Sequence, residues 1–330
     1  MEKLKIGITH GYTNGVSYEV ILKSFEEPTI FELCTPIVYG SPKLATYHKK
    51  ALDLNTNFTI IQNAENAIEG KLNILECFTD EVKVELRAET PEAETAMKTS
   101  SNKAKDDFNN SLFHVLISAP GDKANHQGIP IHINHMMRIA SVTGSCPLGD
   151  ATKELSVENI LEKLRIFSKS LQRDFMITRP RIAVLTLNPT KGKEEKELIM
   201  PAIEKAEAEQ ICAFGPYNTD QFFAENFYTH YDGILAMYYD QAIVPFNLLT
   251  NDYAVVYFAN EDRVHTTTLH GAELNNAGKG ITPHTSFTNA IYTAIDIYRN
   301  RERFDEAHAN PLPKLFHDKR EDNRRNNNIE

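Results

Sequence analysis

Residues 180–189 read PRIAVLTLNP, a continuous apolar run that ends at Asn188-Pro189. An apolar run of four to eight residues without alternation is typical of a parallel strand buried on both faces. Residues 112–120, LFHVLISAP, repeat the pattern and also end at a proline. Helices must cover both faces of such a sheet, so the two stretches favour an α/β fold.

Strand-like and helix-like segments alternate on either side of these runs. The expected strands are 5–9, 35–39, 58–61, 72–77, 112–118, 182–187, 233–237 and 254–259. The expected helices are 17–25, 41–54, an exposed one at 91–109, 156–171, 194–210 and one from Thr285 or Ser286. Ser41 and Ser156 are suited to cap two of these helices. The alternation predicts an α/β fold with mainly parallel sheets.

Ligands in such folds bind at the carboxyl ends of the strands. The loops that follow the expected strands are therefore the first candidates for a site. They are residues 9–15, 119–123, 188–192, 238–241 and 265–271.

The length and charge of the chain, together with its apolar runs, limit the classes of protein to which it can belong. The chain has 330 residues, and 35 Lys and Arg against 45 Asp and Glu give a net charge of −10. The length fits two domains or one large α/β unit. The acidic excess argues against nucleic acid as a partner, because phosphate neutralisation needs clustered cations. No apolar run approaches the roughly 18–20 residues of a membrane span, and residues 1–9 lack a signal-peptide core. We expect a cytoplasmic protein that acts on a small molecule.

The four cysteines, Cys34, Cys77, Cys146 and Cys212, are widely spaced and form no C-x-x-C pair. This spacing predicts neither a zinc site nor a disulfide framework. We expect reduced thiols that pack as small apolar groups. The G-x-G-x-x-G fingerprint, the P-loop and the G-x-S-x-G elbow are also missing from the sequence, so it does not indicate an ordinary Rossmann, P-loop or hydrolase site.

Histidines offer two candidate pairs for a metal, since neutral imidazoles bind Zn²⁺. His265 and His270 are expected in one loop, and His132 and His135 form the second pair. Histidines that are solvated or hydrogen-bonded explain both pairs more simply, above all His132, whose alternation with isoleucine suits a strand face.

Two further side chains have open interpretations. Asp240 follows an apolar strand, where either a catalytic carboxylate or a polar cap is expected. Lys123 could hold an anion or lie in solvent.

Several segments occur in an order that indicates a family. They are GITHG at 7–11 with Asn14-Gly15 and EVILK at 19–23, Ala119-Pro120 with Lys123, 180–187 before Asn188-Pro189, PAI at 201–203, FGP at 214–216 with Asp220, Tyr231-Asp232, AMY at 236–238 before Asp240-Gln241, His270-Gly271, and AGKG at 277–280. The ordered set covers most of the chain and resembles the 4-hydroxythreonine-4-phosphate dehydrogenase family of vitamin B6 synthesis.

The resemblance implies a fold and an assembly. The fold would be two α/β/α domains with mainly parallel sheets, like isocitrate and isopropylmalate dehydrogenases, in a homodimer with the site near the subunit interface. We expect a first domain of residues 1–135 plus 280–318, a second of 136–279 that carries interface and site loops, and a polar tail at 319–330.

The resemblance also implies chemistry. The family oxidises the substrate hydroxyl by hydride transfer to NAD, and the product then loses CO₂. A divalent metal, Zn²⁺ or Mg²⁺, bound by three histidines polarises the substrate oxygen. By position, Asp240 and Lys123 would be catalytic, and Asn188, His265 and Asn247 would bind substrate.

The chain departs from the family at the metal ligands. Of the three histidine positions only His270 is a histidine, and Ser145 and Tyr239 stand at the other two. Neutral serine is a poor ligand for these ions, and tyrosine must lose a proton near pKa 10 before it coordinates well.

The phosphate-binding residues are also reduced. Asn247 stands where the family has lysine, Val256 where it has asparagine and His265 where it has arginine. The family's Gly-His-Thr-Glu loop has no counterpart between Lys123 and Thr143. Each change removes a charge or donor that would pair with a phosphate oxygen.

Three hypotheses follow from the sequence. The chain is a working dehydrogenase with a rebuilt site, or a catalytically impaired paralogue that binds a ligand or pairs with an intact subunit as a heterodimer, or a dehydrogenase for a different hydroxy acid. NADH formation, co-purification and NAD binding distinguish them.

Overall fold

The computed structural model describes residues 3–78, 82–122, 128–190, 192–250 and 254–310. Twelve strands in this part of the chain form one sheet with the order β3-β4-β2-β1-β5-β12-β11-β6-β7-β10-β8-β9. The strands are β1 Leu4–Thr9, β2 Cys34–Gly40, β3 Phe58–Ile61, β4 Leu72–Glu76, β5 Val115–Ser118, β6 Ile129–Ile133, β7 Arg138–Ser141, β8 Ile182–Leu185, β9 Ala213–Tyr217, β10 Gly233–Ala236, β11 Val255–Ala259 and β12 Val264–Thr268.

Most strand pairs are parallel. β11 is antiparallel to both β12 and β6, and β6 is antiparallel to β7. The other pairs, including β1 with β5 and β5 with β12, are parallel. The predicted α/β fold with a mainly parallel sheet is confirmed.

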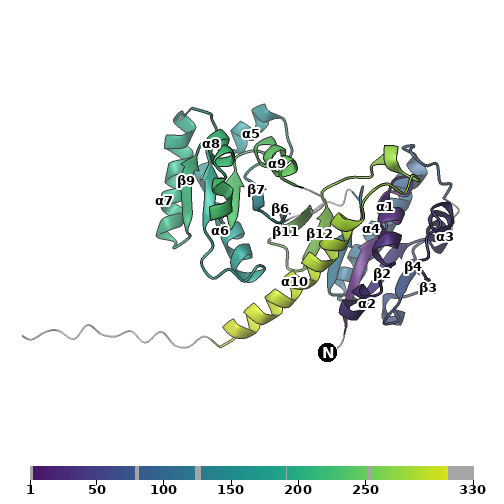
Figure 1. Cartoon of the computed structure of the whole chain (residues 1–330). Helices are drawn as coiled ribbons and strands as arrows, with labels where there is room; N and C mark the ends of the chain where they lie inside the picture. Colours follow the sequence, from purple (N-terminus) through teal and green to yellow (C-terminus); the bar gives the residue numbers. More distant parts are fainter. Residues whose placement is uncertain (1–2, 79–81, 123–127, 191, 251–253, 311–330) are drawn as a thin grey trace, which may run out of the picture.

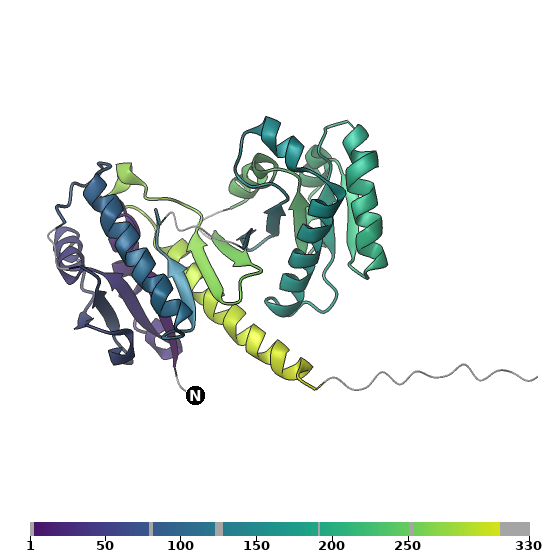
Figure 2. The ribbon, with the colours of Figure 1, turned by 180° about the vertical axis from the view of Figure 1, so that it is seen from behind.

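Helices cover both faces of this sheet (Figures 1 and 2). The α-helices are α1 Ser17–Ser24, α2 Ile30–Leu33, α3 Pro42–Ala51, α4 Pro91–Asn109, α5 Leu148–Glu154, α6 Val157–Arg173, α7 Met200–Ala208, α8 Thr219–Ala224, α9 Tyr239–Leu248 and α10 Thr285–His308. Short 3₁₀ segments are η1 Ala64–Asn66, η3 Phe227–His230 and η4 Leu274–Asn276, and η2 Glu195–Ile199 is a π-helical segment. Figure 1 shows two lobes joined at β12, β11 and β6, with α10 running alongside the junction. Within the described residues, no helix is both long and apolar enough to cross a lipid bilayer.

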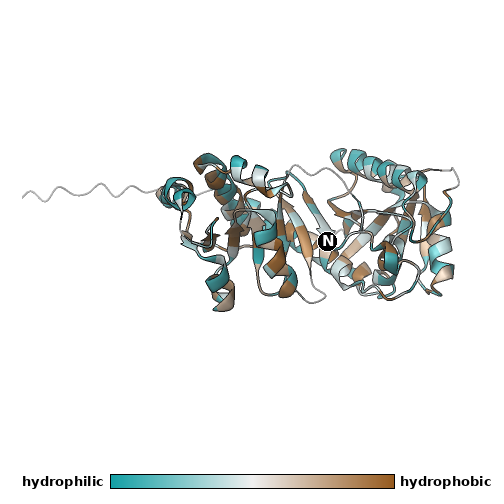
Figure 3. Cartoon of the chain, turned by 90° about the horizontal axis from the view of Figure 1, so that it is seen from above, coloured by the Kyte–Doolittle hydropathy of each residue, from teal (hydrophilic) through white to brown (hydrophobic). Residues whose placement is uncertain are grey.

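The core follows from the apolar runs. The strands are largely hydrophobic in Figure 3, and hydrophilic residues gather on the outer helices. One large cluster of buried side chains lies between the sheet and the helices α1, α6 and α10, and two smaller clusters lie on the opposite face, near α4 and near α8 and α9. Ile182, Ala183, Val184 and Leu185 are all fully buried, as the opening run predicts.

The structure confirms some of the expected helix caps and buried faces and corrects others. The Ser156 hydroxyl accepts a bond from the Asn159 amide at 3.1 Å, so this cap is confirmed. Ser41 precedes α3 but makes no such side-chain bond, so the cap predicted there is wrong. The helix at 91–109 has the expected bounds, but one face is buried through Ala93, Met97 and Phe108, so it is not simply exposed. Burial raises the pKa of the free Cys34 thiol to about 12, as expected of a cysteine that packs as an apolar group.

The sheet is continuous across the boundary expected at residues 135/136. The division into two domains remains a prediction. The polar tail expected at 319–330 and residues 311–318 lie outside the described residues.

Candidate functional site

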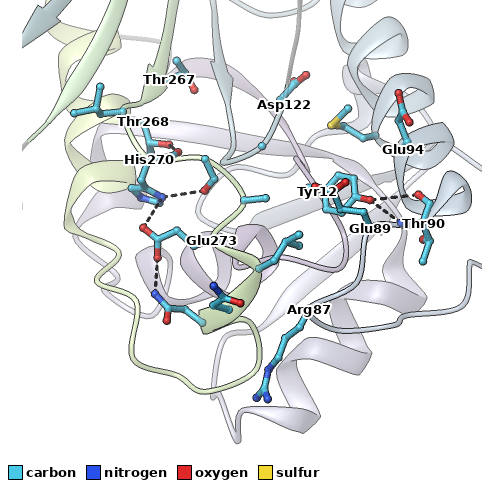
Figure 4. A pocket seen from close by; sticks show the side chains of 18 of the residues that line it. Tyr12, Arg87, Glu89, Thr90, Glu94, Asp122, Thr267, Thr268, His270 and Glu273 are labelled. Atoms are coloured by element: carbon cyan, nitrogen blue, oxygen red, sulfur yellow. Dashed lines mark hydrogen bonds and ion pairs between the residues drawn. The ribbon is translucent and has the colours of Figure 1, made fainter. Parts of the chain in front are cut away.

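A pocket of about 1210 Å³ opens where three parallel strands end (Figure 4). Tyr12 comes from the loop after β1, Asp122 from the loop after β5, and His270 with Glu273 from the loop after β12. The start of α4 supplies the opposite wall. β1, β5 and β12 are neighbours in the sheet and parallel, so their carboxyl ends meet at one edge, where ligands bind in this fold class.

His270 is oriented by the loop that carries it. Its Nδ1 lies 3.3 Å from the Gly271 carbonyl oxygen and 3.6 Å from Glu273 Oε1. Glu273 Oε2 in turn accepts bonds from Asn276 Nδ2 at 2.9 Å and Thr282 Oγ1 at 3.1 Å. Two acceptors beside Nδ1 favour the proton there, which leaves a lone pair on Nε2. That Nε2 is buried and has no hydrogen-bond partner among the described residues.

Asn247 meets His270 in an adjoining pocket of about 420 Å³. Asn247 is exposed near the end of α9, and Thr282 and Ser286 line the same space. Of the residues expected in the site, these two are therefore brought together.

Asp240 and Asn188 line neither of these two pockets. Asp240 is exposed in the first turn of α9. Its neighbour Gln241 is buried and bridges strands, since its Oε1 accepts from the Met237 amide at 2.7 Å and its Nε2 donates to the Thr186 carbonyl at 2.6 Å. Segment 238–241 is therefore largely a helix start rather than the expected loop. Lys123 lies outside the described residues.

His265 is not in a loop, so this prediction is wrong. It belongs to β12, its side chain is 3% exposed, and its Nε2 lies 2.9 Å from Ser118 Oγ. The run Val264–Thr268 is rich in β-branched residues, which was the available signal for a strand. Its substrate-binding role remains a prediction.

Asn188 is held by a buried carboxylate. Glu195 is 1% exposed and accepts backbone N–H bonds from Leu187 at 3.0 Å, Asn188 at 2.8 Å and Gly192 at 2.6 Å. Burial alone would raise the pKa of Glu195, but these bonds and the Asn188 side chain outweigh it, and the pKa is lowered. The carboxylate thus closes the loop after β8.

We expect Glu195→Gln to lower the free energy of unfolding by about 1–3 kcal/mol at neutral pH, because backbone donors lose a charged acceptor. A lowered folded pKa means that this stabilisation is present above pH 4.5 and is lost as the pH falls through the folded-state pKa. Urea unfolding of both proteins at neutral and acidic pH measures the difference. The control is Glu197→Gln, which changes a nearby exposed carboxylate and should leave the free energy of unfolding close to that of the wild type. If the difference in stability between the wild type and Glu195→Gln grew on acidification, the role assigned to Glu195 would be contradicted.

Comparisons with known proteins identify the family. Residues 125–294 match the family model described as "Pyridoxal phosphate biosynthetic protein PdxA". A 4-hydroxythreonine-4-phosphate dehydrogenase from Bacteroides thetaiotaomicron is 42% identical over 97% of this chain and 96% of its own length. One from Prosthecochloris aestuarii is 30% identical over 89% of this chain and 97% of its own. The chain belongs to the 4-hydroxythreonine-4-phosphate dehydrogenase family.

A solved structure agrees with the fold. The crystal structure of 4-hydroxythreonine-4-phosphate dehydrogenase from Klebsiella pneumoniae has a TM-score of 0.76 at 21% identity and covers 90% of this chain and 98% of that one. That from Burkholderia phymatum has a TM-score of 0.71, also at 21% identity, with 90% and 99% covered. At this identity the likeness shows the shared fold.

The residues present do not fit the three-histidine metal centre that the family resemblance implied. His270 offers one unpartnered nitrogen. Ser145 is exposed between β7 and α5, and Tyr239 begins α9 with its ring 6.4 Å from that of His132. In the part of the chain that the structure describes, no three or more His, Cys, Asp or Glu side chains gather as a metal site. A single imidazole is too few ligands for a stable Zn²⁺ site.

Proposed function

We propose that this chain oxidises the hydroxyl of 4-hydroxythreonine 4-phosphate with NAD, as a step of vitamin B6 synthesis in the cytoplasm. The observation that carries the proposal is the 42% identity to the Bacteroides thetaiotaomicron relative over 97% of the chain. The pocket at the ends of β1, β5 and β12 supports it, because it lies where this fold class binds ligands.

The pocket fits NAD and a substrate by size and by donors. Its volume of about 1210 Å³ is above the roughly 300–1,000 Å³ of ordinary small-molecule sites. Arg87 supplies a positive charge, and Asn275 and Asn276 supply amide groups along one wall. Bound NAD would supply the hydride acceptor, while the protein orients the substrate and excludes water. We assign no step to a metal, because the ligand set does not fit one.

A second candidate function is favoured by Ser145 and Tyr239, which stand at two positions where the family resemblance implies metal-binding histidines. In this alternative the chain binds the family's ligands without turning them over and pairs with an intact paralogue as a heterodimer. In the first proposal it forms the homodimer expected of the family.

NADH formation by the purified protein separates the two. The protein receives NAD with phosphorylated or unphosphorylated 4-hydroxythreonine, with and without Zn²⁺ or Mg²⁺, and the Bacteroides thetaiotaomicron relative is assayed alongside. Turnover of the phosphorylated substrate supports the proposal, and turnover of only the unphosphorylated one identifies a different hydroxy acid as substrate. No turnover beside an active relative contradicts the proposal, and co-purification with an intact subunit would then support the heterodimer.

A further inference from the structure

A line of polar side chains runs from the pocket through the sheet. Asp122 lines the pocket and is partly exposed to it. Its Oδ2 accepts bonds from Thr9 Oγ1 at 2.6 Å and Ser118 Oγ at 3.2 Å. Ser118 lies 2.9 Å from His265 Nε2, whose ring is buried in β12. The line therefore links the carboxyl ends of β1 and β5 to the second residue of β12.

The hydrogens in this line can be assigned. A serine hydroxyl has one proton, and Ser118 donates it to Asp122. Its oxygen therefore accepts from His265, which places a proton on Nε2. On the far side, His265 Nδ1 lies 4.0 Å from Glu261 Oε2. Glu261 thus lies beside Nδ1, while Nε2 is linked to Asp122 through the Ser118 hydroxyl. Both hydroxyl donors hold the same carboxylate oxygen, Oδ2.

The geometry points to Asp122 as the group that accepts the proton of the substrate hydroxyl, with Thr9, Ser118 and His265 as positioning residues. The inference rests on the proposed function. The hydroxyl-bearing carbon passes its hydrogen as hydride to the nicotinamide ring, the O–H proton passes to the Asp122 carboxylate, and the C–O bond becomes a carbonyl. NAD is reduced to NADH and the substrate is oxidised, so protons and electrons balance.

The surroundings of Asp122 suit a proton acceptor. Burial raises the pKa of this carboxyl, partly opposed by the bonds from Thr9 and Ser118. A carboxylate with a raised pKa is a stronger base, and a general base works best when its pKa approaches the working pH. His270 lines the same pocket, but its Nε2 atom is buried, whereas Asp122 is partly exposed.

The test compares Asp122→Asn with the wild type in NADH formation and in direct NAD binding. We expect kcat to fall by about 100- to 10,000-fold while the Kd for NAD and the midpoint of thermal unfolding stay near wild type. Asp296→Asn makes the same chemical change at an exposed site on α10 and should keep wild-type kcat.

Two further variants distinguish a loss of catalysis from a loss of folding. Asp122→Glu keeps a carboxylate and should recover part of kcat. Ser118→Ala leaves Asp122 in place and should lower kcat about tenfold with KM and NAD affinity unchanged, a split that general destabilisation would not give. If the wild type is active and Asp122→Asn has the same kcat, the inference about Asp122 is wrong while the proposed function stands. A wild type that binds NAD without turnover overturns the proposed function, and the inference with it.

Discussion

Replacing Asp174 by Asn is expected to lower the free energy of unfolding by about 3–5 kcal/mol, because it leaves a buried arginine without its counter-charge. Asp174 Oδ1 accepts from Arg301 Nε at 2.7 Å, and Oδ2 accepts from Tyr257 at 2.6 Å and Ser170 at 2.7 Å. The side chains of Asp174 and Arg301 are 4% and 8% exposed. Urea or guanidinium unfolding measures the change.

The matched control joins the same two helices at the surface. Arg173 near the end of α6 donates to Asp305 on α10 at 2.9 Å, and the Asp305 side chain is 54% exposed. Exposed ion pairs contribute about 0–1 kcal/mol, so Asp305→Asn should cost far less than Asp174→Asn. Equal losses in the two variants would show that burial does not govern these pairs. A small loss for Asp174→Asn alone would show that the Asn amide accommodates the arginine.

The apolar runs made most of the fold predictable. β8 is predictable because Ile182–Leu185 is a continuous apolar run that is buried on both faces. α6 is predictable because its apolar residues recur at helical spacing behind the Ser156 cap. β12 was missed because its side chains are polar. In the sheet, neighbours satisfy them, as when Thr266 Oγ1 donates to the Ala290 carbonyl at 2.9 Å, so polarity did not mean exposure.

The site was predictable only as a set of loops. Loops after β1, β5 and β12 were all ranked as candidates, and they converge because these strands are adjacent and parallel. The loop after β8 and the start of α9 carry the same sequence signal, but they follow β8 and β10, which lie beyond β7 in the other lobe of the sheet (Figure 1). Which loops meet depends on pairing between strands more than 100 residues apart, and local patterns carry no information about it.

This chain departs from the residues that the family resemblance implies at two metal-ligand positions, Ser145 and Tyr239, and also at phosphate-binding positions such as Asn247. The fold keeps the strand ends together and His270 in place, yet the described residues gather no metal ligand set. A metal centre contributes charge stabilisation worth several kcal/mol in the transition state. Without a metal to lower the pKa of the substrate hydroxyl, a protein base must accept a less acidic proton, which is the role inferred for Asp122.

The pocket also depends on a close backbone approach that Gly15→Ala is expected to disrupt. A Cβ on Gly15 would overlap the carbonyl oxygen of Ala272 and lie 3.0 Å from its Cβ. The Val16 amide donates to the same carbonyl at 3.0 Å, so the two loops are joined at this point. Ala272 lies between His270 and Glu273, and its displacement would move both pocket residues.

We expect Gly15→Ala to lower the free energy of unfolding by about 1–3 kcal/mol through overpacking and to weaken NAD binding, measured by titration. Gly149→Ala is the control, since a Cβ there would meet nothing within 4 Å and alanine is favoured over glycine in a helix, so we expect no loss of stability. Loss of stability without loss of NAD affinity would place the cofactor away from the His270 loop. If Gly15→Ala were as stable as the wild type, the loops at Gly15 and Ala272 could move apart without cost. Their backbone contact would then not hold the pocket walls in place.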